Sequence, residues 1–205
     1  MAMDSDRLTD EFGVISRYFR PLTGGNPAAL DLLDDGALIQ PTAGTQTVVT
    51  CDALIAGVHF LEDSLPETVA ARALRVNLSD LAAMGADPLA YTLALMVPSG
   101  TPAKWFEDFS SQLLEDQKRY GICLIGGDTV VTPGPLSVSI TAFGEVPSNC
   151  ALTRSAAGVG DRIYVTGTIG DAALGLSALK GDLKQCDKET IEYFTNKFLW
   201  PEPRL

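Results

Sequence analysis

Basic residues are scarce in this sequence. Its 205 residues include 15 Lys and Arg against 26 Asp and Glu, so the formal net charge is −11. A nucleic-acid backbone and an anionic membrane surface both attract clustered Lys and Arg, so neither is an expected partner. Anionic small molecules are still possible substrates, because carboxylates can bind them through divalent cations.

Cysteine and histidine are also few. The four cysteines, Cys51, Cys123, Cys150 and Cys186, form no Cys-x-x-Cys pair, and His59 is the only histidine. A zinc site made of Cys and His ligands is therefore disfavoured. The low density of cysteine in a chain of this length also argues against a disulfide scaffold.

Long apolar runs are absent. No stretch reaches the roughly 18 residues of a membrane-spanning helix. Residues 1–10 lack the basic and apolar regions of a secretory signal. These absences predict a cytoplasmic protein. A composition of 46% apolar and 20% charged residues is typical of a folded globular chain.

Apolar spacing and turn residues predict strands and helices in mixed order. Ser64 and Glu67 have the spacing of a capping box at a helix start, and Gly85 and Gly121 suit left-handed helix ends. Strands are expected at about 46–51, 89–97, 122–125, 136–146 and 163–166. Helices are expected at about 10–19, 64–84, 101–120, from 171, and 188–199.

This order predicts an α+β fold whose N-terminal mixed sheet is covered by helices. A stretch rich in Pro, Gly and Asn near 147–160 predicts a domain boundary. We expect an N-terminal domain at 1–148 and the beginning of a second α+β domain at 149–205. The second domain is expected either to be incomplete or to pack on another chain, because its single predicted strand cannot form a sheet alone.

Aspartates recur beside apolar elements, and each one alone is explained by a role in a turn or cap. As a set with few basic neighbours they would repel one another unless a cation joined them. Carboxylate and phosphate oxygens are usual magnesium ligands, so the set favours a metal–phosphate site. The residues are Asp34, Asp35, Asp52, Asp80 and Asp128.

Glycine-rich phosphate motifs of the Walker and dinucleotide types are absent. Gly126-Gly127 before Asp128 can bring backbone N–H groups close to a phosphate, and so can 167–170 before a helix. Turns of this size are more often only turns, so these two segments are weak evidence alone.

Ordered motifs along nearly the whole chain resemble the thiamine-monophosphate kinase family, which belongs with the aminoimidazole ribonucleotide and selenophosphate synthetases. The motifs are 34–39 (DDGALI), 50–60 (TCDALIAGVHF), 76–86 (VNLSDLAAMGA), 126–129 (GGDT), 152–155 (LTRS), and 164–167 (YVTG) followed by Gly170-Asp171. The resemblance implies an ATP- and magnesium-dependent kinase that makes thiamine diphosphate from thiamine monophosphate. Transfer would be direct and in line, with no protein nucleophile.

The resemblance also implies roles for individual residues. Magnesium ligands would be Asp35, Thr50, Cys51, Asp52, Asp80 and Asp128. ATP would contact Gly127, Asp128 and Arg154, and the thiamine phosphate would contact His59. Domain 1–148 would bind ATP and metal, and would pair through its sheet with a second copy to form a homodimer.

Several positions depart from the family pattern. Leu33 stands where the family has Gly, and Cys51 and Ala53 stand where it has Thr. A thiol is a poor magnesium ligand, so Cys51 would offer its backbone carbonyl. The family's second acidic motif, Asp-x-Ser-Asp-Gly, is absent, so we expect a truncated chain. Two alternatives stay open: another ATP-dependent synthetase of the same superfamily, and a non-catalytic nucleotide-binding or dimerisation fragment.

Overall fold

A computed structural model describes residues 11–205 in two compact units. Residues up to Leu152, with Pro203–Leu205, form the first unit, and Thr153–Glu202 form the second. The domain boundary expected after residue 148 stays a prediction. Residues 1–10, whose sequence shows no secretory signal, lie outside the described part.

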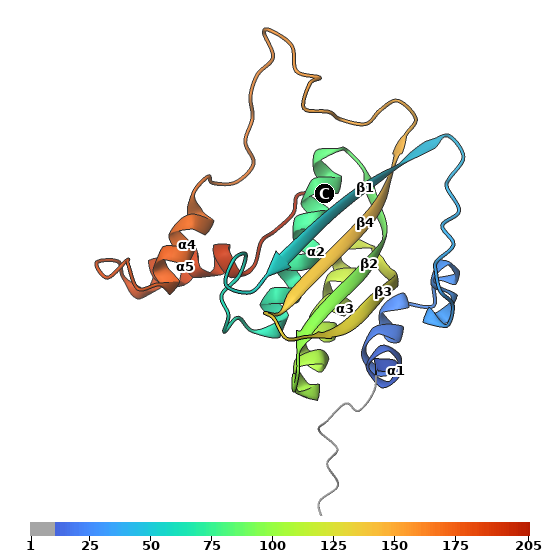
Figure 1. Ribbon diagram of the computed structural model, residues 1–205. Coiled ribbons are helices and arrows are strands. Elements are labelled where there is room, and N and C mark those ends of the chain that lie inside the picture. The colour runs from blue at the N-terminus through green and yellow to red at the C-terminus, as the bar shows by residue number, and fades with distance from the viewer. Residues whose placement is uncertain (1–10) are drawn as a thin grey trace, which may run out of the picture. The chain divides into compact units, whose positions relative to one another are not determined.

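The first unit is built on a four-stranded mixed sheet, in the order β1-β4-β2-β3 (Figure 1). Strand β4 pairs antiparallel with β1 and β2, while β2 and β3 are parallel. The parallel pair requires a crossover, which helix α3 supplies. The strands are β1 (Thr45–Ile55), β2 (Asp87–Pro98), β3 (Cys123–Thr132) and β4 (Ser137–Pro147).

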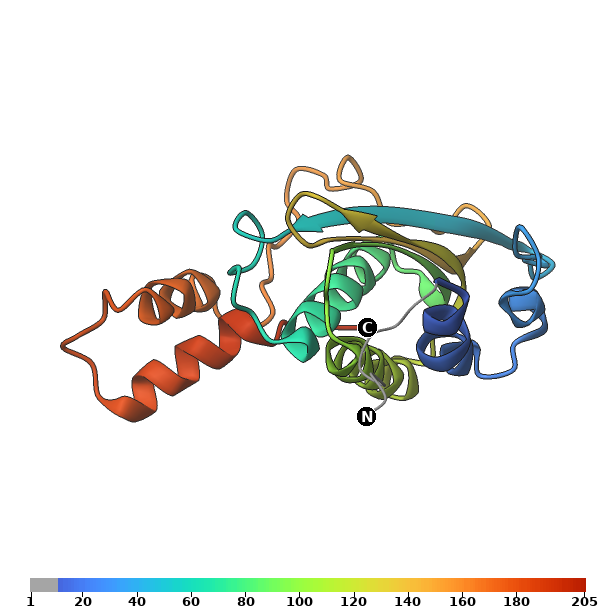
Figure 2. The same cartoon turned by 60° about the horizontal axis from the view of Figure 1, so that its bottom comes forward.

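Helices α2 (Pro66–Ala83) and α3 (Ala103–Tyr120) cover one face of this sheet (Figure 2). Their apolar stripes meet the inward side chains of the strands, and Leu74, Phe109 and Ile140 are fully buried between them. This arrangement confirms the expected α+β fold with a helix-covered mixed sheet.

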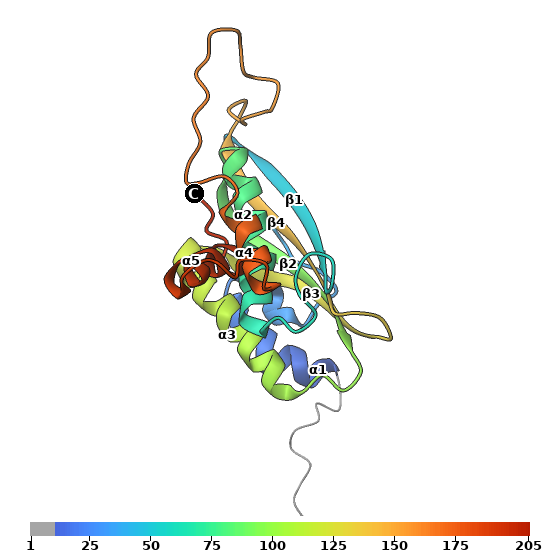
Figure 3. The ribbon, with the colours of Figure 1, turned by 90° about the vertical axis from the view of Figure 1, so that its left-hand side faces the viewer.

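The opposite face of the sheet is largely open in the described part of the first unit (Figure 3). Residues 28–39 cover one end of that face, where Ala29 packs with Ala90 and Ile125. The rest of the face carries small and polar side chains, with Thr92, Thr141 and Cys51 in one cross-strand row.

Short helical segments precede β1 and pack beside β3 and α3. The helix expected at 10–19 is confirmed for its described residues, as α1 (Glu11–Val14) followed by a π-helical turn (Ile15–Phe19). Two 3-10 turns follow, Arg20–Thr23 and Pro27–Leu32. Tyr18 stacks on Phe106 of α3, which fixes this segment to the core.

The second unit contains two packed helices, α4 (Asp171–Leu179) and α5 (Lys188–Leu199), both as expected. The strand expected at 163–166 is wrong. Its residues have no regular structure, and Ile163 is 94% exposed. Its alternation is typical of a strand, but the described second unit offers no other strand to pair with it.

Two expected strand ends are also wrong. Strand β1 continues past Asp52 to Ile55, and β3 continues through Gly126-Gly127-Asp128 to Thr132. Their ladders with β4 and β2 hold these residues extended, with Gly127 opposite Leu93. Pairing across the sheet therefore overrides the local turn preference of Gly and Asp.

The helix ends predicted from glycine are confirmed, but the helix start predicted from the capping box is not. Gly85 and Gly121 have φ values of 71° and 69°, which confirms the expected left-handed ends. Helix α2, however, begins at Pro66 with Leu65 as its N-cap and no side-chain cap. Ser64 is therefore not the cap that the spacing predicted.

Candidate functional site

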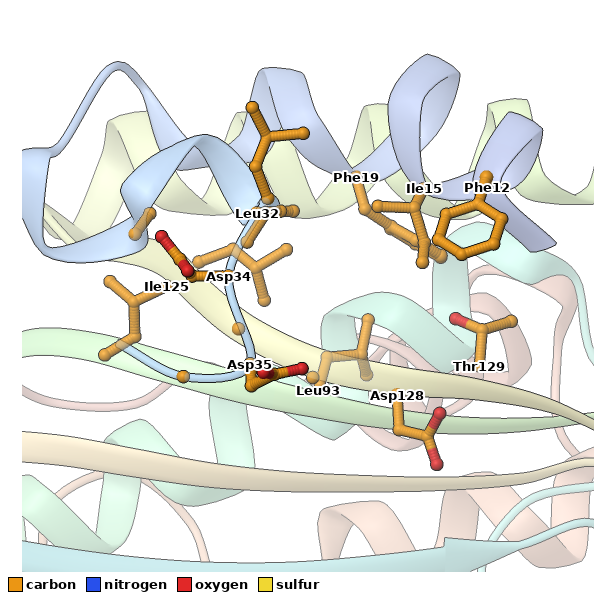
Figure 4. A pocket seen from close by; sticks show the side chains of 16 residues that line it. Phe12, Ile15, Phe19, Leu32, Asp34, Asp35, Leu93, Ile125, Asp128 and Thr129 are labelled. Atoms are coloured by element: carbon orange, nitrogen blue, oxygen red, sulfur yellow. The ribbon is translucent and has the colours of Figure 1, made fainter. Parts of the chain in front are cut away.

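A pocket of about 260 Å³ lies between the N-terminal helical segment and strands β2 and β3. Figure 4 shows carboxylates of Asp35 and Asp128 on one side of it and Phe12 and Ile15 on the other. Asp34, Gly126 and Gly127 also line it. The pocket thus combines acidic groups, glycine backbone and an apolar wall.

The acidic pair Asp34-Asp35 follows a strained turn. Leu30, Asp31 and Leu32 have φ values of 48°, 59° and 56°. The left-handed conformation costs roughly 1–2 kcal/mol for each non-glycine residue. Arg20 forms an exposed ion pair with Asp31, at 3.1 Å, within this turn. Such strain is concentrated at functional sites, where surrounding packing enforces it.

Gly127 allows β3 to pass close to β2 beside the pocket. A Cβ atom built on Gly127 would overlap the backbone of Leu93. Because Gly126 and Gly127 add no side chains, the wall of the pocket at this point is backbone. Backbone that a ligand can approach closely is what a phosphate group requires.

A second polar cluster lies where α2 packs beneath β1. The Thr50 hydroxyl donates to a carboxylate oxygen of Asp80 at 3.0 Å. Thr50 and Asp52 are two residues apart on β1, so both side chains lie on the face toward α2. The cluster therefore combines residues of β1 with one residue near the end of α2.

The carboxylates of this cluster affect one another. Partial burial raises the pKa of Asp52, the neighbouring charge of Asp80 raises it further, and His59 offsets part of the increase. A divalent cation would relieve the repulsion between the two carboxylates. The donor set of carboxylate and hydroxyl oxygens fits Mg²⁺, which keeps several waters and uses one or two carboxylates.

His59 lies in the loop after β1 and is fixed by the backbone. Its Nδ1 atom accepts a hydrogen bond from the Ile55 amide at 3.1 Å. The neutral ring then carries its proton on Nε2, which makes that nitrogen a donor. A donor beside the carboxylates of Asp52 and Asp80 could bind a phosphate oxygen.

The structure brings the expected site residues together in two sets and separates the rest. Asp35, Gly127 and Asp128 line the pocket, whereas Thr50, Asp52, His59 and Asp80 form the cluster below β1. Within residues 11–205, no three His, Cys, Asp or Glu side chains are grouped closely enough to hold a metal by themselves. Ligands from substrate and water would have to complete any metal site.

Two expected residues lie apart from these sets. Cys51 alternates with Thr50 and Asp52 along β1, so its thiol lies on the opposite face, 3.7 Å from the Ser139 hydroxyl. Arg154 belongs to the second unit, which is described by itself. Their expected roles stay predictions.

The apolar wall of the pocket is the part that sequence reasoning missed. Phe12 lies in the helix expected at 10–19, and its side chain is 81% exposed at the pocket. Leu33, the departure from the family's Gly, is 75% exposed there. The only signal was the proximity of Leu33 to the acidic pair in the sequence.

Comparisons with known proteins show the family to which this chain belongs. Residues 33–146 match the family described as "AIR synthase related protein, N-terminal domain". A curated thiamine-monophosphate kinase of Caulobacter vibrioides is 46% identical over 195 residues, covering 95% of this chain and 54% of the relative. This chain therefore spans about half the length of that relative.

Solved structures share the fold. The crystal structure of thiamine-monophosphate kinase from Stenotrophomonas maltophilia K279a has a TM-score of 0.81 and 42% identity, covering 95% of this chain and 62% of that one. The structure described as AaThiL complexed with AMPPCP and TMP has a TM-score of 0.73 and 26% identity, covering 95% and 60%. None of the helices within residues 11–205 has the length and apolar character to cross a membrane.

Proposed function

This chain belongs to the family of AIR synthase related proteins, and we propose that it acts as a thiamine-monophosphate kinase. The proposed reaction transfers the γ-phosphoryl group of ATP directly to thiamine monophosphate in the presence of Mg²⁺. The observation that carries it is the pair of acidic sets, one beside a glycine-walled pocket and one beneath β1. Relatives described as thiamine-monophosphate kinases, including one complexed with AMPPCP and TMP, support this choice.

The pocket residues would bind ATP. Backbone N–H groups at Gly127 would approach phosphate oxygens, and Arg154 would add a planar fork that binds them in pairs. Asp35 and Asp128 would hold Mg²⁺ at this end. Bound Mg²⁺ would supply neutralisation of the phosphate charges.

The cluster beneath β1 would bind the other phosphate. Asp52, Asp80 and the Thr50 hydroxyl would hold Mg²⁺, with the Cys51 backbone carbonyl as a further oxygen. His59 would donate from Nε2 to the thiamine phosphate. These residues position two anions and need no protein nucleophile, because phosphoryl transfer depends mainly on alignment and charge stabilisation.

We further propose that the protein is a homodimer that pairs through the open face of its sheet. The face carries small and polar side chains, and Val49 on it is 58% exposed. A four-stranded sheet of strands up to 12 residues long offers a broad surface. A broad open face of small side chains with an exposed apolar residue suits pairing with a second copy.

The test is formation of thiamine diphosphate by this chain from thiamine monophosphate, ATP and Mg²⁺. We expect product that disappears with a chelator and with Asp52→Asn, and no ATP consumption when thiamine monophosphate is omitted. ATP consumption that requires another acceptor would favour a different synthetase of the superfamily. Absence of Mg²⁺-dependent ATP binding by the folded chain would contradict the proposal.

A further inference from the structure

Asn77 on α2 is a buried amide with an unpaired oxygen. The residue is 1% exposed. Its Nδ2 atom donates to the Ala73 carbonyl at 3.0 Å, while its Oδ1 atom has no hydrogen-bond partner. The Nδ2 bond settles the orientation of the amide, because turning it over would put two oxygens against each other.

Asn at this position is unfavourable for the fold itself. Asn has a low helix propensity in a helix interior. A side-chain hydrogen bond to the i−4 carbonyl does not stabilise the helix, because that carbonyl already has a backbone donor. The Ala73 carbonyl already accepts the backbone N–H of Asn77 in the regular helix. A buried carbonyl oxygen without a donor carries an uncompensated desolvation penalty. Local rules are broken in this way mainly at functional sites.

The position of Asn77 points to the acidic cluster. Asn77 and Asp80 are three residues apart, so they are neighbours on one side of α2. Asp80 faces β1, since its carboxylate accepts from Thr50. Helix α2 packs beneath β1 and is antiparallel to it (Figures 1 and 3). The turn before Asp80 therefore lies toward the end of β1 that carries Asp52.

We propose that Asn77 is a positioning residue of the cation site, whose Oδ1 accepts a hydrogen bond from water bound to a divalent cation held by Asp52 and Asp80. This inference rests on the proposed function. Mg²⁺ retains several of its waters in protein sites, and those waters are donors. An acceptor fixed on the rigid interior of α2 would orient one of them. Substitution of a residue that hydrogen-bonds to a metal ligand, without binding the metal itself, changes metal affinity by about 10- to 100-fold.

The test measures Mn²⁺ binding by electron paramagnetic resonance, with Mg²⁺ as competitor, on the whole 205-residue chain. Asn77→Leu removes the acceptor but keeps the branching and the number of side-chain heavy atoms. We expect roughly a 10- to 100-fold loss of Mn²⁺ affinity, together with a higher midpoint of thermal unfolding, because the unpaired oxygen is gone. A purely structural Asn would give a lower midpoint and unchanged affinity. Asn77→Ser serves if the Leu variant does not fold.

Gln117 on α3 provides the matched control. It is also a buried amide, but its Nε2 donates to the Leu22 carbonyl at 2.8 Å and to the Tyr91 hydroxyl at 3.0 Å. Gln117→Leu should lower the unfolding midpoint and leave Mn²⁺ affinity unchanged. If Asp52→Asn weakens Mn²⁺ binding but the Asn77 variants bind like wild type, the role of Asn77 is overturned. If wild type binds no Mn²⁺, the metal site of the proposed function fails instead.

Discussion

Position 127 requires glycine because there is no space for a Cβ atom. A Cβ there would overlap the Leu93 backbone, whereas a Cβ on Gly126 would lie 3.7 Å from Thr92 Cγ2, an ordinary contact. We expect Gly127→Ala to lower the free energy of unfolding by about 3 kcal/mol, at the upper end of overpacking costs. Gly126→Ala should cost less than about 1 kcal/mol. Urea unfolding monitored by tryptophan fluorescence measures both, and equal costs would contradict the close approach of β3 to β2.

The sequence predicted the aspartates as one set, but not their division between the pocket and the cluster below β1. Asp52 and Asp80 stand 28 positions apart, and only the packing of α2 beneath β1 brings them together. Phe12 had no sequence signal for exposure, because apolar residues are normally counted toward the core. The unpaired oxygen of Asn77 is equally invisible without the helix and its surroundings.

At the scale of elements, α2 and α3 are joined by a buried ion pair. Two guanidinium nitrogens donate to one carboxylate: Arg75 Nε lies 2.8 Å from Asp116 Oδ2, and its Nη2 lies 2.7 Å from Oδ1. Gln112 donates to the same carboxylate. The side chains of Arg75 and Asp116 are 7% and 2% exposed.

Removing one partner of this pair leaves the other charge buried. We expect Arg75→Met to destabilise the chain by about 3–5 kcal/mol. The double variant Arg75→Met, Asp116→Leu should recover most of that loss, because both charges are then gone. Guanidinium unfolding of the two single variants and the double variant gives the coupling energy. Simple addition of the two single costs would show that the groups do not act as a pair.

Helix α5 begins with a side-chain cap that makes it sensitive to acid. Asp187 accepts hydrogen bonds from the Thr190 backbone amide and hydroxyl, and these lower its pKa. Its contribution is complete above the ordinary pKa of Asp and is lost as the pH falls through the lowered value. The protection factor of the Thr190 amide against hydrogen exchange should therefore fall below about pH 4. Asp187→Asn still caps but does not titrate, so the protection factor in that variant should lack this pH dependence.

At the scale of the whole molecule, long helices with clear end signals could be predicted from the sequence. Strands could not be predicted where they depend on a neighbouring strand. Helix α5 has the expected bounds because Asp187 caps it and Pro201 follows it. Residues 163–166 alternate like a strand, yet a strand exists only with a neighbour, and its own sequence cannot say whether one is present. The continuation of β3 through Gly126-Gly127 also depends on a neighbouring strand, because pairing with β2 holds these residues extended.

The last prediction concerns the open face of the sheet, where a new charge should prevent dimerisation. Thr141 lies on β4 in the row between Thr92 and Cys51, at the centre of that face. If two copies pair there, Thr141→Arg would bury an unpaired charge at their interface, so the dimer should dissociate. Sedimentation equilibrium should give twice the chain mass of 21.7 kDa for wild type and the single mass for Thr141→Arg. Ser111→Arg adds the same charge at an exposed position on α3 and should remain dimeric. A wild-type monomer, or dissociation by both variants alike, would rule out pairing through this face.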